Sequence, residues 1–391
     1  MPIIAIILAS LSLCIWIVLT FFRGSFWLLR LYDDDIATHN PLKSWPRIVA
    51  VVPARNEAET IAQTVEALAA QAYAGEFRIV VVDDHSEDET AALARKAAES
   101  SRAGERVEVL SAAPLAPGWT GKLWAQQQGI QHAAQYAPEH FWLTDADVVH
   151  APDTLSRLVS RAEEQRLDLT SLMVLLQAKT FSERLLIPPF LYFFLKLYPP
   201  GWIASPRSRV AGAAGGCILL RRSALVRAGG ISAIRQEVID DCALGRAVKG
   251  TGGTIWMGLT RKSASLRGYQ SFSEIRDLIA RTAFTQLNYS TVLLLGTVLG
   301  MALTYLVPTA LVFHSSAVVW RLSLAAWALM TITYLPTIRF YRLSPVRAVL
   351  LAAAAAFYSY ATVLSAIRFW LGRGGQWKGR SQTPKASSEA T

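Results

Sequence analysis

The chain has 391 residues, of which 52% are hydrophobic, and its net charge is +10. This apolar content excludes a disordered protein and allows one large folded domain together with membrane segments. The basic residues gather beside apolar segments, which favours a lipid bilayer as the partner and argues against nucleic acid. Cys14, Cys217 and Cys242 are scattered without a CxxC pair, so neither a disulfide framework nor a zinc site is predicted.

The first predicted element is a membrane anchor. Residues 3–22 contain no charged side chain and are long enough to cross a bilayer, and Arg23 and Arg30 follow them. A cleaved signal peptide is disfavoured, because no basic segment precedes this run and no small-x-small cleavage site follows it. We therefore predict an N-terminal transmembrane anchor over residues 1–23, with the next part of the chain in the cytoplasm.

Short apolar runs then alternate with helical stretches. The predicted strands are residues 48–52, 79–82, 107–110 and 141–144, and helices are predicted over residues 57–71 and 87–100. Apolar strands joined by helical crossovers indicate a mainly parallel sheet with both faces covered. Ligands bind such sheets beyond the carboxyl ends of the strands. The sequence therefore predicts an α/β domain within residues 24–290, with its ligand site at that edge.

Three acidic pairs lie at the ends of predicted strands or at the start of a predicted helix: Asp83-Asp84, Asp145-Ala146-Asp147 and Asp240-Asp241. Each pair alone has an ordinary explanation, because aspartate caps helices and is stabilised by the helix dipole. Asp145 and Asp147 are more specific, since alternating carboxylates at a strand end suit a hard divalent cation. The order of the three pairs predicts a site that holds a nucleotide, a metal and a reacting hydroxyl in turn.

Several common cofactor and catalytic motifs are absent from the sequence. The first predicted strand runs into Pro53-Ala-Arg-Asn-Glu57 without a glycine, so the GxGxxG turn of dinucleotide-binding folds is missing. Gly121-Lys122 lacks the upstream glycine and the following hydroxyl residue of a phosphate-binding loop. Neither HExxH nor GxSxG occurs. These absences disfavour a nicotinamide cofactor and phosphoryl transfer of the P-loop type.

Six runs of residues, in this order, resemble the successive motifs of family 2 glycosyltransferases with the GT-A fold: VVPARNEA (51–58), VVDDHS (81–86), GKLWA (121–125), LTDAD (143–147), GGCILL (215–220) and IDDCAL (239–244). Four runs are similar to the hopene-associated glycosyltransferases of bacterial hopanoid pathways: GWTGKLW (118–124), RLLIPPF (184–190), ARTAFTQL (280–287) and RFYRLSP (339–345). The resemblance covers nearly the whole chain. It implies a GT-A catalytic domain with a Rossmann-like, mainly parallel sheet, and α-helical transmembrane segments at both ends.

The resemblance also implies roles for residues in these motifs. The expected donor-binding residues are Pro53, Arg55, Glu57, Asp83, Asp84, Lys122 and Asp145. Asp147, together with Asp145, is expected to hold a divalent metal, Mg²⁺ or Mn²⁺, and the donor diphosphate. Asp241 matches the general base that deprotonates the acceptor hydroxyl, and Asp240 is the competing candidate for that role.

The implied activity is transfer of one hexose from a nucleotide sugar, preferably a UDP-sugar, to a lipid hydroxyl with inversion of the anomeric centre. A hopanoid is the preferred acceptor. Arg281-Thr-Ala-Phe284 stands where many chain-elongating relatives carry Q/R-x-x-R-W, so transfer of a single sugar is favoured. Two alternatives stay open: a polyprenyl-phosphate or other glycolipid glycosyltransferase, and a noncatalytic membrane-anchored nucleotide-binding module. The expected location is the inner membrane of a bacterium, as a multi-pass protein whose catalytic domain faces the cytoplasm.

Two segments of the predicted domain have the composition of membrane-interface elements. Residues 181–204 are rich in aromatic side chains, but their two Pro-Pro pairs argue against a regular helix. Residues 272–289 interleave apolar and charged side chains, which predicts a second interfacial helix. We expect the first segment to admit a lipid-borne hydroxyl to the catalytic site.

The C-terminal region, residues 291–371, contains three candidate spans, at residues 291–313, 322–338 and 348–367. A tail follows over residues 372–391, and we expect it to be basic at first and then disordered. The positive-inside rule places two basic clusters, within residues 339–347 and 368–380, in the cytoplasm. Four full crossings cannot put both clusters on the side of a cytoplasmic catalytic domain. The sequence therefore predicts two to three C-terminal spans and leaves one crossing undecided.

Overall fold

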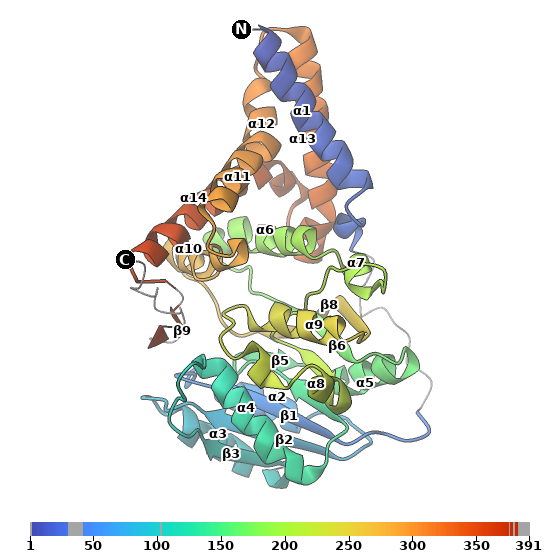
Figure 1. Ribbon diagram of the computed structural model, residues 1–391, viewed down its shortest axis with the longest axis vertical. Coiled ribbons are helices and arrows are strands. Elements are labelled where there is room, and N and C mark those ends of the chain that lie inside the picture. The colour runs from blue at the N-terminus through green and yellow to red at the C-terminus, as the bar shows by residue number, and fades with distance from the viewer. Residues whose placement is uncertain (1, 30–41, 102–103, 375, 378–379, 382–391) are drawn as a thin grey trace, which may run out of the picture.

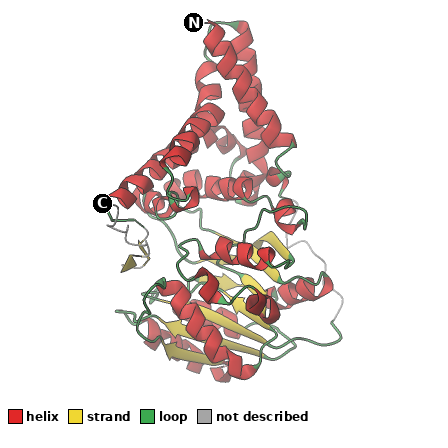
Figure 2. Cartoon of the chain, in the orientation of Figure 1, coloured by secondary structure: helices red, strands yellow, loops and turns green. Residues whose placement is uncertain are grey.

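The computed structural model describes residues 2–29, 42–101, 104–374, 376–377 and 380–381. An α/β domain lies at one end of the molecule, and long helices from the first and last parts of the chain lie at the other (Figures 1 and 2). Arg30, Lys378 and the predicted tail at residues 382–391 lie outside the described residues.

One eight-stranded sheet contains β1 (Ile48–Ala54), β2 (Phe77–Asp83), β3 (Val107–Ser111), β4 (His140–Leu143), β5 (Val148–His150), β6 (Leu169–Leu175), β7 (Ile218–Arg221) and β8 (Ile255–Ser265). Their order is β3-β2-β1-β4-β7-β6-β8-β5. The four strands predicted from the sequence form one half of the sheet, and they pair in parallel. In the other half β6 is parallel to β8, whereas β7 and β5 pair antiparallel with their neighbours. The predicted fold class, a mainly parallel α/β sheet, is confirmed.

Helices cover both faces of the sheet, which explains why its central strand is apolar throughout. Ile48, Ala50 and Val52 belong to one buried cluster, and the intervening Val49 and Val51 belong to another. The first cluster includes side chains of α2 (Ile61–Ala69), α3 (Thr90–Ser100) and α5 (Thr154–Glu164), and the second those of α4 (Gly121–Ala133) and α9 (Asp240–Gly250). Burial of each large aliphatic side chain contributes about 1.5–3 kcal/mol. Packing on both faces therefore holds the carboxyl ends of the strands in place.

Within the described part of the chain, four helical segments are long and apolar enough to cross a membrane: Ile3–Phe21, Thr291–Leu311, Ala317–Phe340 and Pro345–Trp370. The elements in them are α1 (Pro2–Phe21), α11 (Thr291–Met301), the π-helical η6 (Ala302–Leu306), α12 (Val307–Leu311), α13 (Ala317–Phe340), η7 (Pro345–Leu350) and α14 (Leu351–Trp370). Ile3, Val292 and Phe313 are 71%, 77% and 85% exposed. Large apolar side chains this exposed on neighbouring helices indicate association with a membrane.

Two short helices lie between the sheet and these apolar segments: α6 (Phe181–Leu197) and α10 (Phe272–Ala280) (Figure 1). The expectation that the prolines prevent a regular helix in residues 181–204 was wrong for the first pair, because α6 continues through Pro188 and Pro189. At the second pair the helix is interrupted, since α6 ends at Leu197. Its N-terminus is fixed by a capping box between Thr180 and Glu183. Both prolines are buried in the packed interior, so tertiary contacts compensate for the two amide donors that proline lacks. After α6 the chain forms α7 (Pro200–Ala204).

Candidate active site

A cavity of about 260 Å³ lies where the carboxyl ends of β1 and β4 meet the N-termini of α4 and α9. Its walls include seven of the predicted site residues: Pro53, Glu57, Lys122, Asp145, Asp147, Asp240 and Asp241. Phe190 and Phe194 of α6, with Leu278 of α10, close it on the side of the apolar helices. The fold therefore brings the second and third acidic pairs into one cavity, although they are far apart in the sequence.

Lys122 lies between these two acidic pairs. Its Nζ is 2.8 Å from Asp145 Oδ1 and 3.0 Å from Asp240 Oδ2. Burial alone would lower the pKa of Lys122, but attraction to Asp145 and Asp240 outweighs it, and the pKa is raised above its ordinary value. The ammonium group is therefore charged throughout the physiological range. It neutralises part of the negative charge that the cavity would otherwise collect.

We expect Lys122→Met to destabilise the protein by about 1–3 kcal/mol, because two half-buried carboxylates lose their shared cation. Thermal unfolding of the purified protein measures this change. Lys96→Met, on the exposed side of α3, is the matched control and should leave the unfolding temperature almost unchanged. Equal unfolding temperatures for both variants would show that these ion pairs contribute nothing to the fold.

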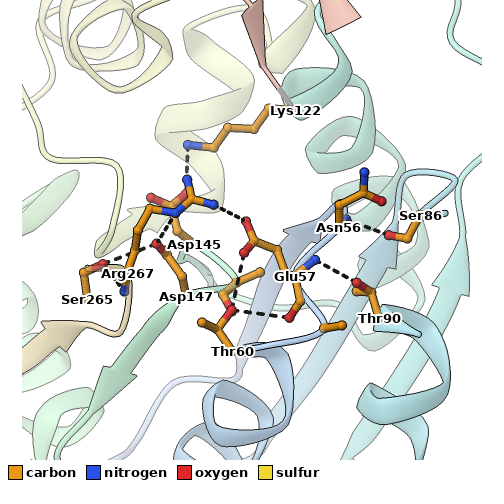
Figure 3. A network of polar contacts seen from close by, with 12 residues as sticks. Asn56, Glu57, Thr60, Ser86, Thr90, Lys122, Asp145, Asp147, Ser265 and Arg267 are labelled. Carbon is orange, nitrogen blue, oxygen red and sulfur yellow. Dashed lines mark hydrogen bonds and ion pairs between the residues drawn. The ribbon is translucent and has the colours of Figure 1, made fainter. Parts of the chain in front are cut away.

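Asp147 lies beside Asp145, as Figure 3 shows, and both line the cavity. Ser265 Oγ donates a hydrogen bond to Asp147 Oδ2 at 3.2 Å, and Arg267 Nε is 4.0 Å from the same oxygen. Burial, and then repulsion by Asp145, raises the pKa of Asp147 to about 6. A carboxyl group that is costly to ionise without a partner is suited to a position where a cation binds.

The donor atoms at this position fit a hard divalent cation. Among the described residues, no cluster of three or more His, Cys, Asp or Glu side chains is arranged for a metal. Mg²⁺, however, commonly takes only one or two protein carboxylates and completes its shell with water and substrate phosphates. Asp145 and Asp147 line the cavity together, so they could hold such an ion with the oxygens of a bound diphosphate.

Asp241 has surroundings different from those of Asp240. Its Oδ2 accepts a hydrogen bond from the Gly215 amide at 2.9 Å, and its Oδ1 accepts one from the Cys242 amide at 2.7 Å. Burial, and then repulsion by Asp240, raises the pKa of Asp241 to about 6. Asp240 instead forms the ion pair with Lys122. The pKa of Asp241 is therefore raised toward neutrality, as a general base requires.

The remaining predicted residues, Arg55, Asp83 and Asp84, are not among those that line the cavity. Arg55 donates to the carbonyls of Asp84 and His85 at 2.5 and 2.8 Å, so it joins the loop after β1 to the loop after β2. Asp84 is fully buried. Asp83 Oδ1 is buried without a hydrogen-bond partner among the described residues, and it is the atom of this group best prepared to accept a donor from a ligand.

Arg267 is a cavity residue that the sequence analysis did not identify. Its guanidinium group is 3.6 Å from Glu57 Oε1 and 4.0 Å from Asp147 Oδ2 (Figure 3). It therefore connects the loop after β1 to the proposed metal-binding position. It follows β8, a strand that was not predicted. The apolar run at residues 255–259 was the available signal for that strand. Arg281, which stands where chain-elongating relatives carry the Q/R-x-x-R-W motif, also lines the cavity.

Comparisons with known proteins agree with this architecture. Residues 49–228 match the family described as Glycosyl transferase family 2. An N-acetylglucosaminyltransferase of Mesorhizobium japonicum is 27% identical over 193 residues, which is 46% of this chain and 41% of that protein. An N-acetylglucosaminyltransferase of Rhizobium leguminosarum bv. viciae is 28% identical over 203 residues, 49% of this chain and 42% of that protein. The chain thus spans less than half the length of these curated relatives.

A solved structure aligns with almost all of the chain. It is a mannosyltransferase from Pyrobaculum calidifontis in complex with GDP-Man and Mn²⁺, with 19% identity and a TM-score of 0.57. The alignment covers 93% of this chain and 98% of that chain. At this identity the likeness shows the fold, and it confirms the predicted GT-A architecture. Residues 49–228 are the part of this fold that matches the Glycosyl transferase family 2 model.

Proposed function

We propose that this chain, which carries a glycosyl transferase family 2 domain over residues 49–228, is a membrane-bound inverting glycosyltransferase that moves one hexose from a nucleotide sugar to a lipid hydroxyl. One observation carries the proposal: a single cavity contains the acidic pair Asp145 and Asp147, the cation Lys122 and the carboxyl group of Asp241. The names of the two curated relatives support transfer of a sugar.

Donor binding is assigned to the side of the cavity formed by β1, β4 and α4. Asp145 and Asp147 would hold a divalent cation, Mg²⁺ or Mn²⁺, which supplies charge neutralisation for the leaving nucleoside diphosphate when bound. Lys122 and Arg267 add positive charge on both sides of these acids. This charge would stabilise the negative charge that develops on the leaving diphosphate. Asp83 and Asp84, next to this side, are proposed to contact the base and ribose, with a UDP-sugar as the preferred donor.

Proton removal is assigned to Asp241. A hydroxyl is a weak nucleophile, so a carboxylate that takes its proton during attack on the anomeric carbon accelerates the reaction. Asp240 is less suited because its carboxylate is already engaged in an ion pair with Lys122. One direct displacement, with the base opposite the leaving diphosphate, inverts the anomeric centre.

The acceptor is proposed to reach Asp241 from the bilayer. Phe190, Phe194 and Leu278 give the cavity an apolar wall on the side of the membrane helices, and a lipid tail would be stabilised against such a wall. The sequence resemblance favours a hopanoid acceptor. A polyprenyl phosphate or another glycolipid is the second candidate. The catalytic domain would face the cytoplasm of a bacterium, with residues 1–23 and 291–371 in its inner membrane.

A direct assay tests this function. Purified protein is supplied with a panel of nucleotide sugars, Mg²⁺ or Mn²⁺, and hopanoid or polyprenyl-phosphate acceptors, and products are identified by mass spectrometry. We expect one lipid to gain the mass of one hexose, with release of the nucleoside diphosphate. Nucleotide-sugar binding without transfer to any lipid in the panel would favour a noncatalytic nucleotide-binding module. Metal-dependent hydrolysis of the sugar nucleotide alone would also contradict transfer.

A further inference from the structure

The fourth apolar segment, η7 with α14, lies differently from the other three. In Figure 1, α1, α12 and α13 meet at the end of the molecule farthest from the sheet, whereas α14 runs obliquely toward α10. Of the most apolar part of this segment, 44% is buried within the protein, against 22% in the first two candidate spans. A helix surrounded by protein on more sides is less available to the lipid than its composition suggests.

Specific contacts place α14 alongside α10 for about half its length. The rings of Phe357 and Phe272 are 6.1 Å apart at one end of the pair. At the other end, Ser365 Oγ donates to the Ala280 carbonyl at 2.5 Å, and Arg368 forms an ion pair with Asp277 at 2.6 Å. Phe272 with Phe357 and Ala280 with Ser365 are both separated by 85 positions (357 − 272 and 365 − 280), so α14 lies parallel to α10 over this stretch. The long side chain of Arg368 extends back to Asp277.

The neighbouring helix α10 carries charges that cannot lie in the hydrocarbon core at low cost. Glu274, Arg276 and Asp277 occur within one turn, and their side chains are at least partly exposed. Each charge costs roughly 2.5–3.5 kcal/mol at the bilayer centre. The helix therefore belongs at the headgroup level, and α14, which lies along it, belongs at or near the same level.

The beginning of the segment leads to the same conclusion. After α13 ends at Phe340, η7 packs back against α13, and α14 then turns toward α10. Tyr358 of α14 donates to the Leu186 carbonyl of α6 at 2.8 Å, and its ring is 4.9 Å from that of Phe193. The segment thus rests on the two helices that separate the sheet from the membrane bundle.

We infer that the chain crosses the bilayer three times, through α1, α11–α12 and α13, and that η7 and α14 form a re-entrant segment in the leaflet next to the catalytic domain. This topology places the basic cluster at residues 339–347 and Arg368 and Arg373 on one side, which removes the conflict with the positive-inside rule. Arg276, Arg368 and Arg373 then lie at the headgroups, where anionic lipids attract them. The inference concerns topology and does not depend on the proposed sugar transfer.

Cysteine labelling of the full-length protein tests the three crossings. In a Cys14→Ala background, in which Cys217 and Cys242 are buried, single cysteines replace Glu99, Ser315, Ser344 or Leu371, all of them exposed. A membrane-impermeant maleimide is applied to right-side-out and to inside-out vesicles. We expect positions 99, 344 and 371 to react from one side and position 315 from the other. Reaction of position 371 from the side of position 315 would overturn the inference.

Reporter fusions give a second measurement that does not require cysteine reactivity. Alkaline phosphatase or green fluorescent protein is joined after Thr391 of the otherwise unchanged chain. The phosphatase is active only outside the cytoplasm. If the catalytic domain is cytoplasmic, three crossings predict a fluorescent fusion and an inactive phosphatase. An active phosphatase, combined with a cytoplasmic position 99, would show that α14 completes a fourth crossing.

Discussion

Asp241→Asn is expected to lower kcat for sugar transfer by about 10²–10⁴, the usual contribution of a general base. Asparagine has the size of aspartate, and its Oδ1 can still accept the hydrogen bond that the Gly215 amide donates. The fold should therefore persist. It cannot take up the proton of the acceptor hydroxyl. Initial rates from mass-spectrometric product analysis measure kcat, and calorimetry with the nucleoside diphosphate should show unchanged donor affinity.

Asp240→Asn is the matched control for this variant, because it removes one carboxylate from the adjacent position on the same helix. Asp240 forms an ion pair with Lys122, so its loss should weaken donor binding more than it slows the proton transfer. A kcat loss of about 10²–10⁴ for Asp240→Asn, together with full activity of Asp241→Asn, would exchange the two roles.

The pH dependence of kcat/KM provides an independent test of the same carboxyl group. Burial and the neighbouring Asp240 raise the pKa of Asp241 to about 6, and the base works only when ionised. Activity should therefore fall as pH decreases through about 6. With one ionisation required, that of Asp241, kcat/KM should fall about tenfold per pH unit on the acid side. The residual activity of Asp241→Asn should depend less steeply on pH on the acid side. A pH profile identical to that of the unsubstituted protein would contradict the assignment of Asp241 as the general base.

Asp147→Asn is expected to weaken metal-dependent binding of the nucleoside diphosphate by at least about tenfold. The substitution removes one of two carboxylates at the proposed metal-binding position, and hard divalent cations prefer charged oxygen ligands. Titration calorimetry with UDP in the presence and absence of Mn²⁺ separates the metal-dependent part of the affinity. Asp153→Asn is the control, since that carboxylate pairs with Lys262 outside the cavity. Equal metal-dependent affinities for the two variants would place the cation elsewhere.

Much of the α/β domain was predictable because its signals are local. β1 and β2 were predictable because they are continuous apolar runs that are buried along almost their whole length. The missed strands differ among themselves. β5 has three residues and the end of β8 is partly exposed, whereas β6 is as long as β1 and buried, but Thr170 and Ser171 interrupt its apolar residues. Arg267 was missed because its position at the cavity depends on recognising β8.

The sequence by itself determined which carboxylates stand at strand ends and helix starts, and which segments are apolar enough for a membrane, because both depend on residues a few positions apart. Only the tertiary structure decided how these parts combine. Lys122 forms an ion pair with Asp240, 118 positions away in the sequence, and burial together with the neighbouring Asp240 raises the pKa of Asp241. Likewise, α6 continues through two prolines and α14 lies along a charged helix. Packing energies between distant segments outweigh local preferences in each case.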